Sequence, residues 1–336
     1  MNDTAASHHP LRVAMYGPSH DHIGDRLAAL GLDLEVLTFD ADGAFRIDGA
    51  LVAPDQVDID YLWLSTHVAA DEARQAAFDL ALALRSVDVV QTFNAGLDDP
   101  VYAALSAKGV RVCNSSAQGV AIAEYVFAQV MSLTHPVAEQ RAMQAAREWR
   151  TTPFRELSRT HWLIIGHGPI GQAVVKRARA FEAEVSVIRR AAAPAEGADR
   201  TGTLADLPAF LPDADIVLLA CPLNAATAGL AGPAFFNAIK PGAIFVNIAR
   251  GGVVDEAALI AALDAERLET AVLDVVRTEP LPPDDPLWRH PKVRITPHTS
   301  FAGDGSRGRW DALFLENIAR YANGEALLRE VAPEDL

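Results

Sequence analysis

The chain has 336 residues, 50% of them hydrophobic and 22% charged, so it is long enough for two domains with ordinary hydrophobic cores. Its 29 Lys and Arg residues against 44 Asp and Glu residues give a formal net charge of -15, which argues against a nucleic-acid-binding surface. The two cysteines lack metal-ligand spacing and the N-terminus lacks an apolar signal segment, so we expect a cytoplasmic protein without metal or membrane contact.

Short apolar segments alternate with helical patterns along the first third of the chain. Strands are expected at residues 11–17, 34–39, 61–65, 87–93 and 110–114. The segments between them, such as 71–84, carry apolar residues at helical spacing. Because the strand segments are continuously hydrophobic, both faces of each sheet should be covered, as in parallel sheets built from βα units.

A second series of strands follows the apolar helix expected at 119–133, which is typical of a core or interface helix rather than a membrane span. The strands are expected at residues 162–166, 184–188, 215–220, 243–249, 270–276 and 293–297, with an exposed loop at 191–202. Two such series predict an α/β protein with two doubly wound parallel-sheet domains. Ligands of these sheets bind beyond the carboxyl ends of the strands, so the residues that follow each strand are the candidates for function.

The segment WLIIGHGPIGQAVV passes from a strand through a glycine-rich turn into a helix. Glycines at these positions allow a tight turn, close approach of a pyrophosphate and close packing of the helix on the strand, and Pro169 suits the first helical turn. A glycine-rich turn without a ligand is the alternative, but the flanking strand and helix favour dinucleotide binding. The predicted cofactor turn comprises Gly166, Gly168, Pro169, Ile170 and Gly171.

The strand after the glycine turn ends in Arg189 and Arg190. Sites for NAD usually have an Asp or Glu at this point, where it binds the ribose hydroxyls. Two guanidinium groups suit a 2′-phosphate instead, so the sequence favours NADPH over NADH. A solvated basic pair in a surface loop is the alternative.

Three polar residues follow three later strands: Arg250, Glu279 and His298. A guanidinium at the end of a buried strand loses solvation unless it meets an anion. Each residue alone has an ordinary structural explanation, as a surface ion pair, a turn residue or a core histidine. Together, at the ligand-binding edge of one sheet, they suggest an active site.

At this point the sequence resembles the D-isomer-specific 2-hydroxyacid dehydrogenase family. The resemblance rests on the ordered segments GHGPIG, CPLNAATAGL, NIARGGVVDE, LDVVRTEPLPPDDPLW and ITPHTS. It implies a Rossmann cofactor domain, residues 117–298, inserted in a flavodoxin-like substrate domain, residues 1–116 and 299–336.

The resemblance also implies roles for the candidate residues. Arg250 would contact the carboxylate and keto oxygen of a 2-oxo acid, His298 would be the general acid, and Glu279 would orient its imidazole. The loop FNAG would bind the carboxylate through Asn94, Ala95 and Gly96, with a plain strand-to-helix turn as the alternative.

Further positions are carried over from the family by the same resemblance. Residues expected at the cofactor are Pro222 and Leu223 near the adenosine and ribose, Ile248 and Ala249 beside the nicotinamide ring, and Asp274 near the nicotinamide end of the cofactor. Trp288 stands where the family sometimes reaches the substrate, although a bulky residue there is as often part of the core.

The expected function is reduction of a short 2-oxo acid, such as glyoxylate or hydroxypyruvate, with NADPH or NADH. A dehydrogenase of another small anion is one alternative, and a nucleotide-sensing scaffold resembling the family's transcriptional corepressors is another. Residues 119–133 and 146–157 resemble the family's dimerisation region, so a symmetric homodimer is expected.

Overall fold

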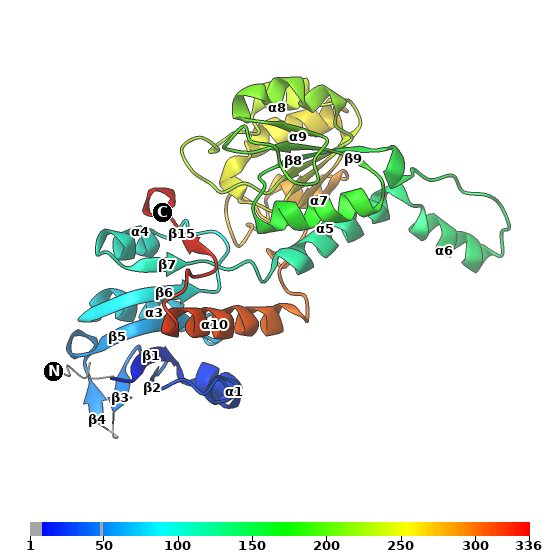
Figure 1. Ribbon diagram of the computed structural model, residues 1–336. Helices are drawn as coiled ribbons and strands as arrows, with labels where there is room; N and C mark the ends of the chain where they lie inside the picture. Colours follow the sequence, from blue (N-terminus) through cyan, green and yellow to red (C-terminus); the bar gives the residue numbers. More distant parts are fainter. Residues whose placement is uncertain (1–8, 48–49) are drawn as a thin grey trace. The chain divides into compact units, whose positions relative to one another are not determined.

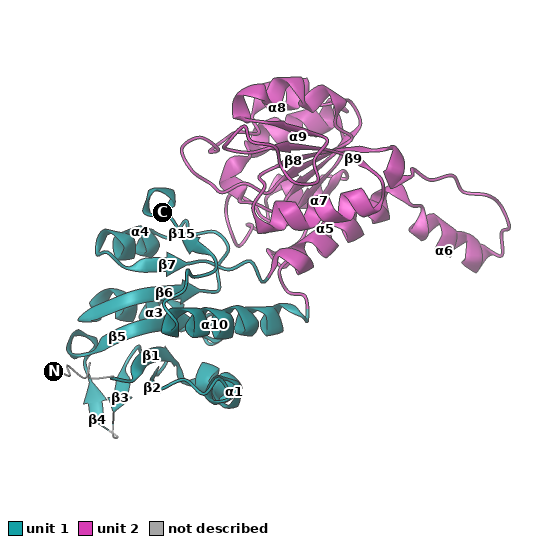
Figure 2. Cartoon of the chain, viewed as in Figure 1, with its two compact units in different colours: residues 1–117, 304–336 teal, residues 118–303 magenta. Residues whose placement is uncertain are grey.

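The computed structural model describes residues 9–47 and 50–336, which form two compact α/β units (Figures 1 and 2). Unit 1 comprises the residues up to 117 together with 304–336, and unit 2 comprises residues 118–303. Both sheets are largely parallel, as the sequence predicted. The unit boundaries fall close to the predicted domain boundaries at 116/117 and 298/299.

The sheet of unit 1 has the strand order β15-β7-β6-β5-β1-β2-β3-β4. Its parallel strands are β1 (Leu11–Tyr16), β2 (Leu34–Phe39), β5 (Asp58–Leu64), β6 (Ser86–Thr92) and β7 (Arg111–Cys113). The antiparallel strands at its edges are β3 (Phe45–Ile47), β4 (Ala50–Val52) and β15 (Glu330–Val331). The parallel strands are the five predicted ones, whereas the short edge strands were not predicted.

Helices cover both faces of this sheet. They are α1 (Gly17–Ala28), α2 (His67–Ala70), α3 (Arg74–Ala83), α4 (Pro100–Ala107) and α10 (Ser306–Ala322). In β1, Val13 and Met15 belong to the core that includes α1 and α10, whereas Ala14 and Tyr16 belong to the core that includes α3 and α4. Alternate residues therefore enter opposite cores, which explains why the strand is apolar throughout.

Unit 2 has an all-parallel sheet with the order β10-β9-β8-β11-β12-β13-β14. The strands are β8 (His161–Ile165), β9 (Glu184–Ile188), β10 (Arg200–Gly202), β11 (Ile216–Leu219), β12 (Ala243–Asn247), β13 (Leu268–Leu273) and β14 (Val293–Ile295). The helices are α5 (Gly119–Thr134), α6 (Val137–Ala146), α7 (Pro169–Ala180), α8 (Pro233–Ala238) and α9 (Glu256–Asp264). Strand order reverses at β8, so the glycine turn that follows β8 lies at the switch point of the sheet.

The predicted apolar helix and exposed loop of unit 2 are both found, with one correction. Helix α5 buries Ile122, Val126 and Val130 in the core that also receives α7. Residues 191–202 are not a loop throughout, because the last three form β10 beside β9. Within the described part of the chain, no helix is long and apolar enough to cross a membrane.

Candidate active site

The turn after β8 is built so that only glycine fits at two positions. Gly166 has φ of +110°, and a Cβ atom there would come within 2.4 Å of the Ala220 carbonyl oxygen. At Gly171 a Cβ atom would come within 2.1 Å of the Gly166 oxygen, so α7 packs directly on the turn. The space next to Gly168 is open, and Pro169 begins α7. This geometry fits a diphosphate at the helix N-terminus.

Arg189 and Arg190 follow β9, the strand next to the glycine turn. The pairing of β8 with β9 sets Ile165 opposite Ile188, and the Gly166 N–H donates to the Ile188 oxygen at 2.8 Å. Arg189 is half-buried and Arg190 is exposed. The Arg189 N–H donates to the Gly202 oxygen of β10 at 2.9 Å, which fixes the backbone at this point.

The turn that carries Arg250 is held by a buried amide at the end of β12. Asn247 is 1% exposed; its Nδ2 donates to the Arg250 oxygen at 3.1 Å, and its Oδ1 accepts the Ala249 N–H at 3.0 Å. A Cβ atom on Gly251 would come within 2.0 Å of the Val276 carbonyl carbon, so this turn lies directly against the segment that leads to Glu279. Sequence reasoning missed Asn247, although a polar residue ending an apolar strand was the available signal.

Glu279 and His298 follow the neighbouring strands β13 and β14, and the structure brings them into direct contact. His298 Nδ1 and Glu279 Oε2 are 2.8 Å apart, and Glu279 Oε1 accepts the Val276 N–H at 3.1 Å. The two side chains are 43% and 38% exposed, so the pair is accessible to a substrate. With Nδ1 bonded to the carboxylate, the remaining nitrogen of His298 is left for another partner.

Asp274 anchors the loop that carries His298. It is 2% exposed and accepts hydrogen bonds from Thr296 Oγ1 at 2.6 Å, the Thr299 N–H at 2.9 Å and the Ser300 N–H at 3.1 Å. The Asp274 carbonyl oxygen also accepts the His298 N–H at 2.8 Å. His298 has φ of +50°, a left-handed conformation that residues other than glycine adopt where surrounding structure enforces it. The predicted contact of Asp274 with the nicotinamide end stays a prediction.

The remaining carried-over residues of unit 2 differ in environment. Ile248 and Ala249 are 5% and 6% exposed and belong to the hydrophobic cores. Leu223 packs on Gly252, where a Cβ atom would come within 3.0 Å of its side chain, and the neighbouring Pro222 is exposed. Trp288 is 50% exposed, and its Nε1 donates to the Pro282 oxygen at 3.0 Å. The alternative that Trp288 is a simple core residue is therefore wrong.

The loop of Asn94, Ala95 and Gly96 follows β6 in unit 1. The Asn94 and Ala95 oxygens accept hydrogen bonds at 2.8 Å and 2.9 Å, from the Ser115 N–H and from Asn114 Nδ2. Within residues 9–47 and 50–336, the N–H groups of Ala95 and Gly96 have no acceptor. The loop is thus held by its oxygens, and two adjacent donors remain for an anion.

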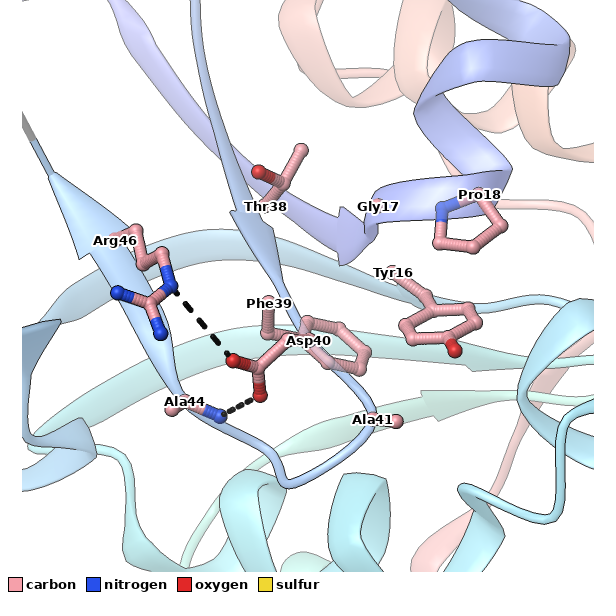
Figure 3. Close-up of a pocket in the computed structure, with 9 residues that line it drawn as sticks. All are labelled: Tyr16, Gly17, Pro18, Thr38, Phe39, Asp40, Ala41, Ala44 and Arg46. Atoms are coloured by element: carbon pink, nitrogen blue, oxygen red, sulfur yellow. Dashed lines mark hydrogen bonds and ion pairs between the residues drawn. The ribbon is translucent and has the colours of Figure 1, made fainter. Parts of the chain in front are cut away.

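A hollow of about 230 Å³ lies elsewhere in unit 1, at the carboxyl ends of β1 and β2. Figure 3 shows the residues that line it. Its charged residues pair with each other, since Arg46 Nε lies 3.9 Å from an Asp40 oxygen whose carboxylate also accepts the Ala44 N–H. None of the predicted site residues lines it. The hollow is open and its charges are already neutralised, so the candidate site is the strand-end cluster of unit 2.

Neither cysteine is a candidate nucleophile. Cys113 and Cys221 are buried, and burial raises the pKa of their thiols to about 12 and about 11. Both therefore stay protonated and unreactive near neutral pH. No group of three or more His, Cys, Asp or Glu side chains among the described residues is arranged to hold a metal ion.

Known proteins resemble the chain in sequence and in structure. Residues 127–300 match the family model described as D-isomer specific 2-hydroxyacid dehydrogenase, NAD binding domain. A D-isomer specific 2-hydroxyacid dehydrogenase from Xanthobacter autotrophicus Py2, solved with NADPH and MES, is 27% identical with a TM-score of 0.76, over 97% of this chain and 98% of that one. An NADPH-dependent glyoxylate/hydroxypyruvate reductase from Sinorhizobium meliloti, solved with NADP and sulfate, is 26% identical with a TM-score of 0.72, over 98% and 99%.

A D-3-phosphoglycerate dehydrogenase from Mycobacterium leprae is 32% identical over 302 residues, which are 89% of this chain and 55% of that protein. The chain thus spans about half the length of this relative.

Proposed function

Because the chain belongs to the D-isomer specific 2-hydroxyacid dehydrogenase family, we propose that it reduces a short 2-oxo acid, such as glyoxylate or hydroxypyruvate, to the D-2-hydroxy acid. The observation that carries this proposal is the His298–Glu279 pair, 2.8 Å apart and accessible, in the same unit as the Arg250 turn and the glycine turn. The pair supplies a proton donor, and Arg250 supplies a binding group for a carboxylate.

The reduction adds a hydride and a proton to the keto group. When bound, the nicotinamide supplies the hydride to the carbonyl carbon. Arg250 binds the substrate carboxylate and polarises the keto oxygen, because its forked N–H groups can engage both. His298 donates a proton from its second ring nitrogen to that oxygen as it gains charge, while Glu279 holds Nδ1 and stabilises the protonated ring. Binding of the carboxylate by the N–H groups of Ala95 and Gly96, which the family resemblance implies, stays a prediction.

For the cofactor, the proposal is a preference for NADPH over NADH. It is supported by Arg189 and Arg190 at the end of β9, where a carboxylate would favour the ribose hydroxyls of NAD. The two structures described above were solved with NADPH and NADP, which agrees with this assignment.

A panel of 2-oxo acids assayed with NADPH and NADH in parallel tests the proposal. We expect the highest kcat/KM with a short 2-oxo acid and NADPH, and a lower value with a phosphorylated one. We expect His298→Asn to lower turnover about a hundredfold, the scale of lost general acid catalysis, without changing the Kd of NADPH.

The control is His290→Asn, since His290 precedes β14, contacts the exposed Asp264 at 3.3 Å and should leave turnover unchanged. Formate or phosphite as the preferred substrate would favour the dehydrogenase of another small anion. Tight NADPH binding without turnover of any oxo acid would favour the corepressor-like scaffold.

A further inference from the structure

One residue of the glycine turn remains without a role in the proposed reaction. His167 lies between Gly166 and Gly168, and sequence reasoning missed it although it assigned the neighbouring residues of the motif to the cofactor. The pairing of β8 with β9 brings this turn beside the end of β9, where Arg189 stands. An imidazole and a guanidinium from adjacent strand ends are therefore neighbours at the switch point of the sheet.

One ring nitrogen of His167 is buried and unpaired within the described residues. The backbone of Glu196, in the loop between β9 and β10, lies near the imidazole and favours its protonated form. Its Nε2 is buried and has no hydrogen-bond partner in the described part of the chain. A buried polar atom without a hydrogen-bond partner costs free energy. The unpaired Nε2 of His167 therefore points to a ligand that supplies the missing partner.

Burial and the charge of Arg189 together disfavour the protonated form of His167 in the free protein. Burial, and then the positive charge of Arg189, lower the pKa of His167 below its ordinary value of 6.5, while the backbone hydrogen bond and the charge of Glu196 oppose this. In the tautomer that carries its proton on Nδ1, neutral His167 has a lone pair at Nε2. An added negative charge nearby would favour the protonated ring, and Nε2 would then become a donor.

We propose that His167, together with Arg189, reads the 2′ position of the cofactor's adenosine ribose, donating from Nε2 to a 2′-phosphate when protonated and accepting from a 2′-hydroxyl when neutral. The inference rests on the proposed NADPH preference and deepens it, because the choice between cofactors becomes dependent on pH. Nε2 is covered in the free protein, so the loop between β9 and β10 must shift to admit the phosphate. Its residues 190–194 are exposed, which leaves them room to move.

The direction of the pH dependence follows from proton linkage. Binding of a 2′-phosphate favours protonated His167, so NADPH binding takes up a proton near neutral pH, whereas NADH binding does not. The affinity for NADPH relative to NADH should therefore rise as the pH falls. The phosphate itself has a second pKa of about 6 and loses charge at lower pH, which acts in the opposite sense and makes a variant comparison necessary.

The test is calorimetric titration of NADPH, NADH and 2′,5′-ADP into the wild-type protein, His167→Asn and the control His135→Asn. His135 lies at the end of α5 and contacts Phe154 rather than the glycine turn. We expect the ratio of the Kd for NADH to the Kd for NADPH to rise about fivefold or more from about pH 8 to about pH 6 in the wild type and the control, the scale of one charge-assisted hydrogen bond. In His167→Asn the ratio should stay flat or fall, and proton uptake, measured in buffers of different ionisation enthalpy, should disappear.

The outcomes separate the inference from the proposed function. If His167→Asn prefers NADPH with the same pH dependence and proton uptake as the wild type, the role of His167 is wrong while the cofactor preference stands. If the wild type binds NADH at least as well as NADPH at every pH, both are wrong. Retained binding of NADH by His167→Asn shows that this variant is folded, and His167→Gln provides a second substitution for the same comparison.

Discussion

Asp274 anchors the loop that carries His298, the proposed general acid. Its carboxylate accepts hydrogen bonds from Thr296 Oγ1 and from the N–H groups of Thr299 and Ser300. Residues on both sides of His298 are therefore bonded to one buried group. The left-handed backbone at His298 costs on the order of 1 kcal/mol or more and persists because these bonds enforce it. Tyr125 of α5 adds a further hydrogen bond to Thr296 at 2.7 Å. Asp274 is therefore a positioning residue for the proposed acid.

Asp274→Asn should reduce turnover about tenfold or more while the Kd of NADPH stays within about twofold, because the amide can no longer accept from all the loop donors. Thr296→Val removes one of these donors. It should reduce turnover by a smaller factor, again with little change in the Kd of NADPH. Stopped-flow kinetics measure the turnover of both variants, and titration measures their Kd for NADPH. The surface variant Asp264→Asn is the control. A large rise in the Kd of NADPH with unchanged turnover would instead support the nicotinamide contact implied by family resemblance.

At the scale of elements, a second buried carboxylate joins segments at the amino ends of the strands in the sheet of unit 2. Asp215 precedes β11, is 7% exposed and accepts from Lys240 Nζ at 2.7 Å, the His161 N–H at 2.9 Å and Arg155 Nη2 at 2.5 Å. These partners come from the start of β8, the approach to β12 and the segment after α6. Burial raises the pKa of Asp215, but these hydrogen bonds and charges outweigh it, and the pKa is lowered overall.

Asp215→Asn should lower the free energy of unfolding by about 2 kcal/mol at neutral pH, because Arg155 and Lys240 would lose the negative charge that pairs with them. A lowered carboxyl pKa contributes stability above the ordinary value of 3.8 and loses it as the pH falls through the folded value. The difference between wild type and variant should therefore shrink below about pH 4. Chemical denaturation at several pH values measures this difference, with the exposed Asp213→Asn as the matched control. A difference that does not vary with pH would mean that packing, not charge, stabilises this edge.

Some elements could be predicted from sequence and others could not, for physical reasons. Most of the parallel strands are buried on both faces, so each of these is a largely apolar run, whereas the short edge strand β10 is not. The glycines of the cofactor turn are dictated by contacts that exclude a Cβ atom. Strands β3, β4 and β15 are two or three residues long and lie at a sheet edge, so no hydrophobic pattern marks them. The anchoring role of Asp274 depends on partners more than 20 residues further along the chain, which no local pattern reveals.

At the scale of the whole molecule, three exposed large apolar residues lie on the arm formed by α6 and residues 147–156, which extends from the rest of unit 2 (Figure 1): Val137, Trp149 and Phe154. In α6 Met143 is buried and the other residues are exposed, and Trp149 just beyond it is fully exposed. The arm is nevertheless ordered: Arg150 pairs with Glu139 at 2.8 Å, and at its base the Arg155 N–H donates to the Thr134 oxygen at 3.1 Å. An ordered segment that exposes a tryptophan is typical of a surface that meets a partner.

The predicted partner is a second copy of the chain, in a symmetric homodimer whose interface includes this arm and α5. Sedimentation equilibrium should give about twice the chain mass of 36.0 kDa at micromolar concentration. Trp149→Lys should weaken the dimer by about 2 kcal/mol or more, because tryptophan is among the residues that contribute most to interfaces and a buried lysine would lack a counterion. Trp288→Lys, a similar change at a half-exposed tryptophan outside the arm, should leave the mass unchanged. A wild-type protein that sediments as a monomer would contradict the prediction, and a dimer indifferent to Trp149→Lys would mean that the two copies meet through another surface.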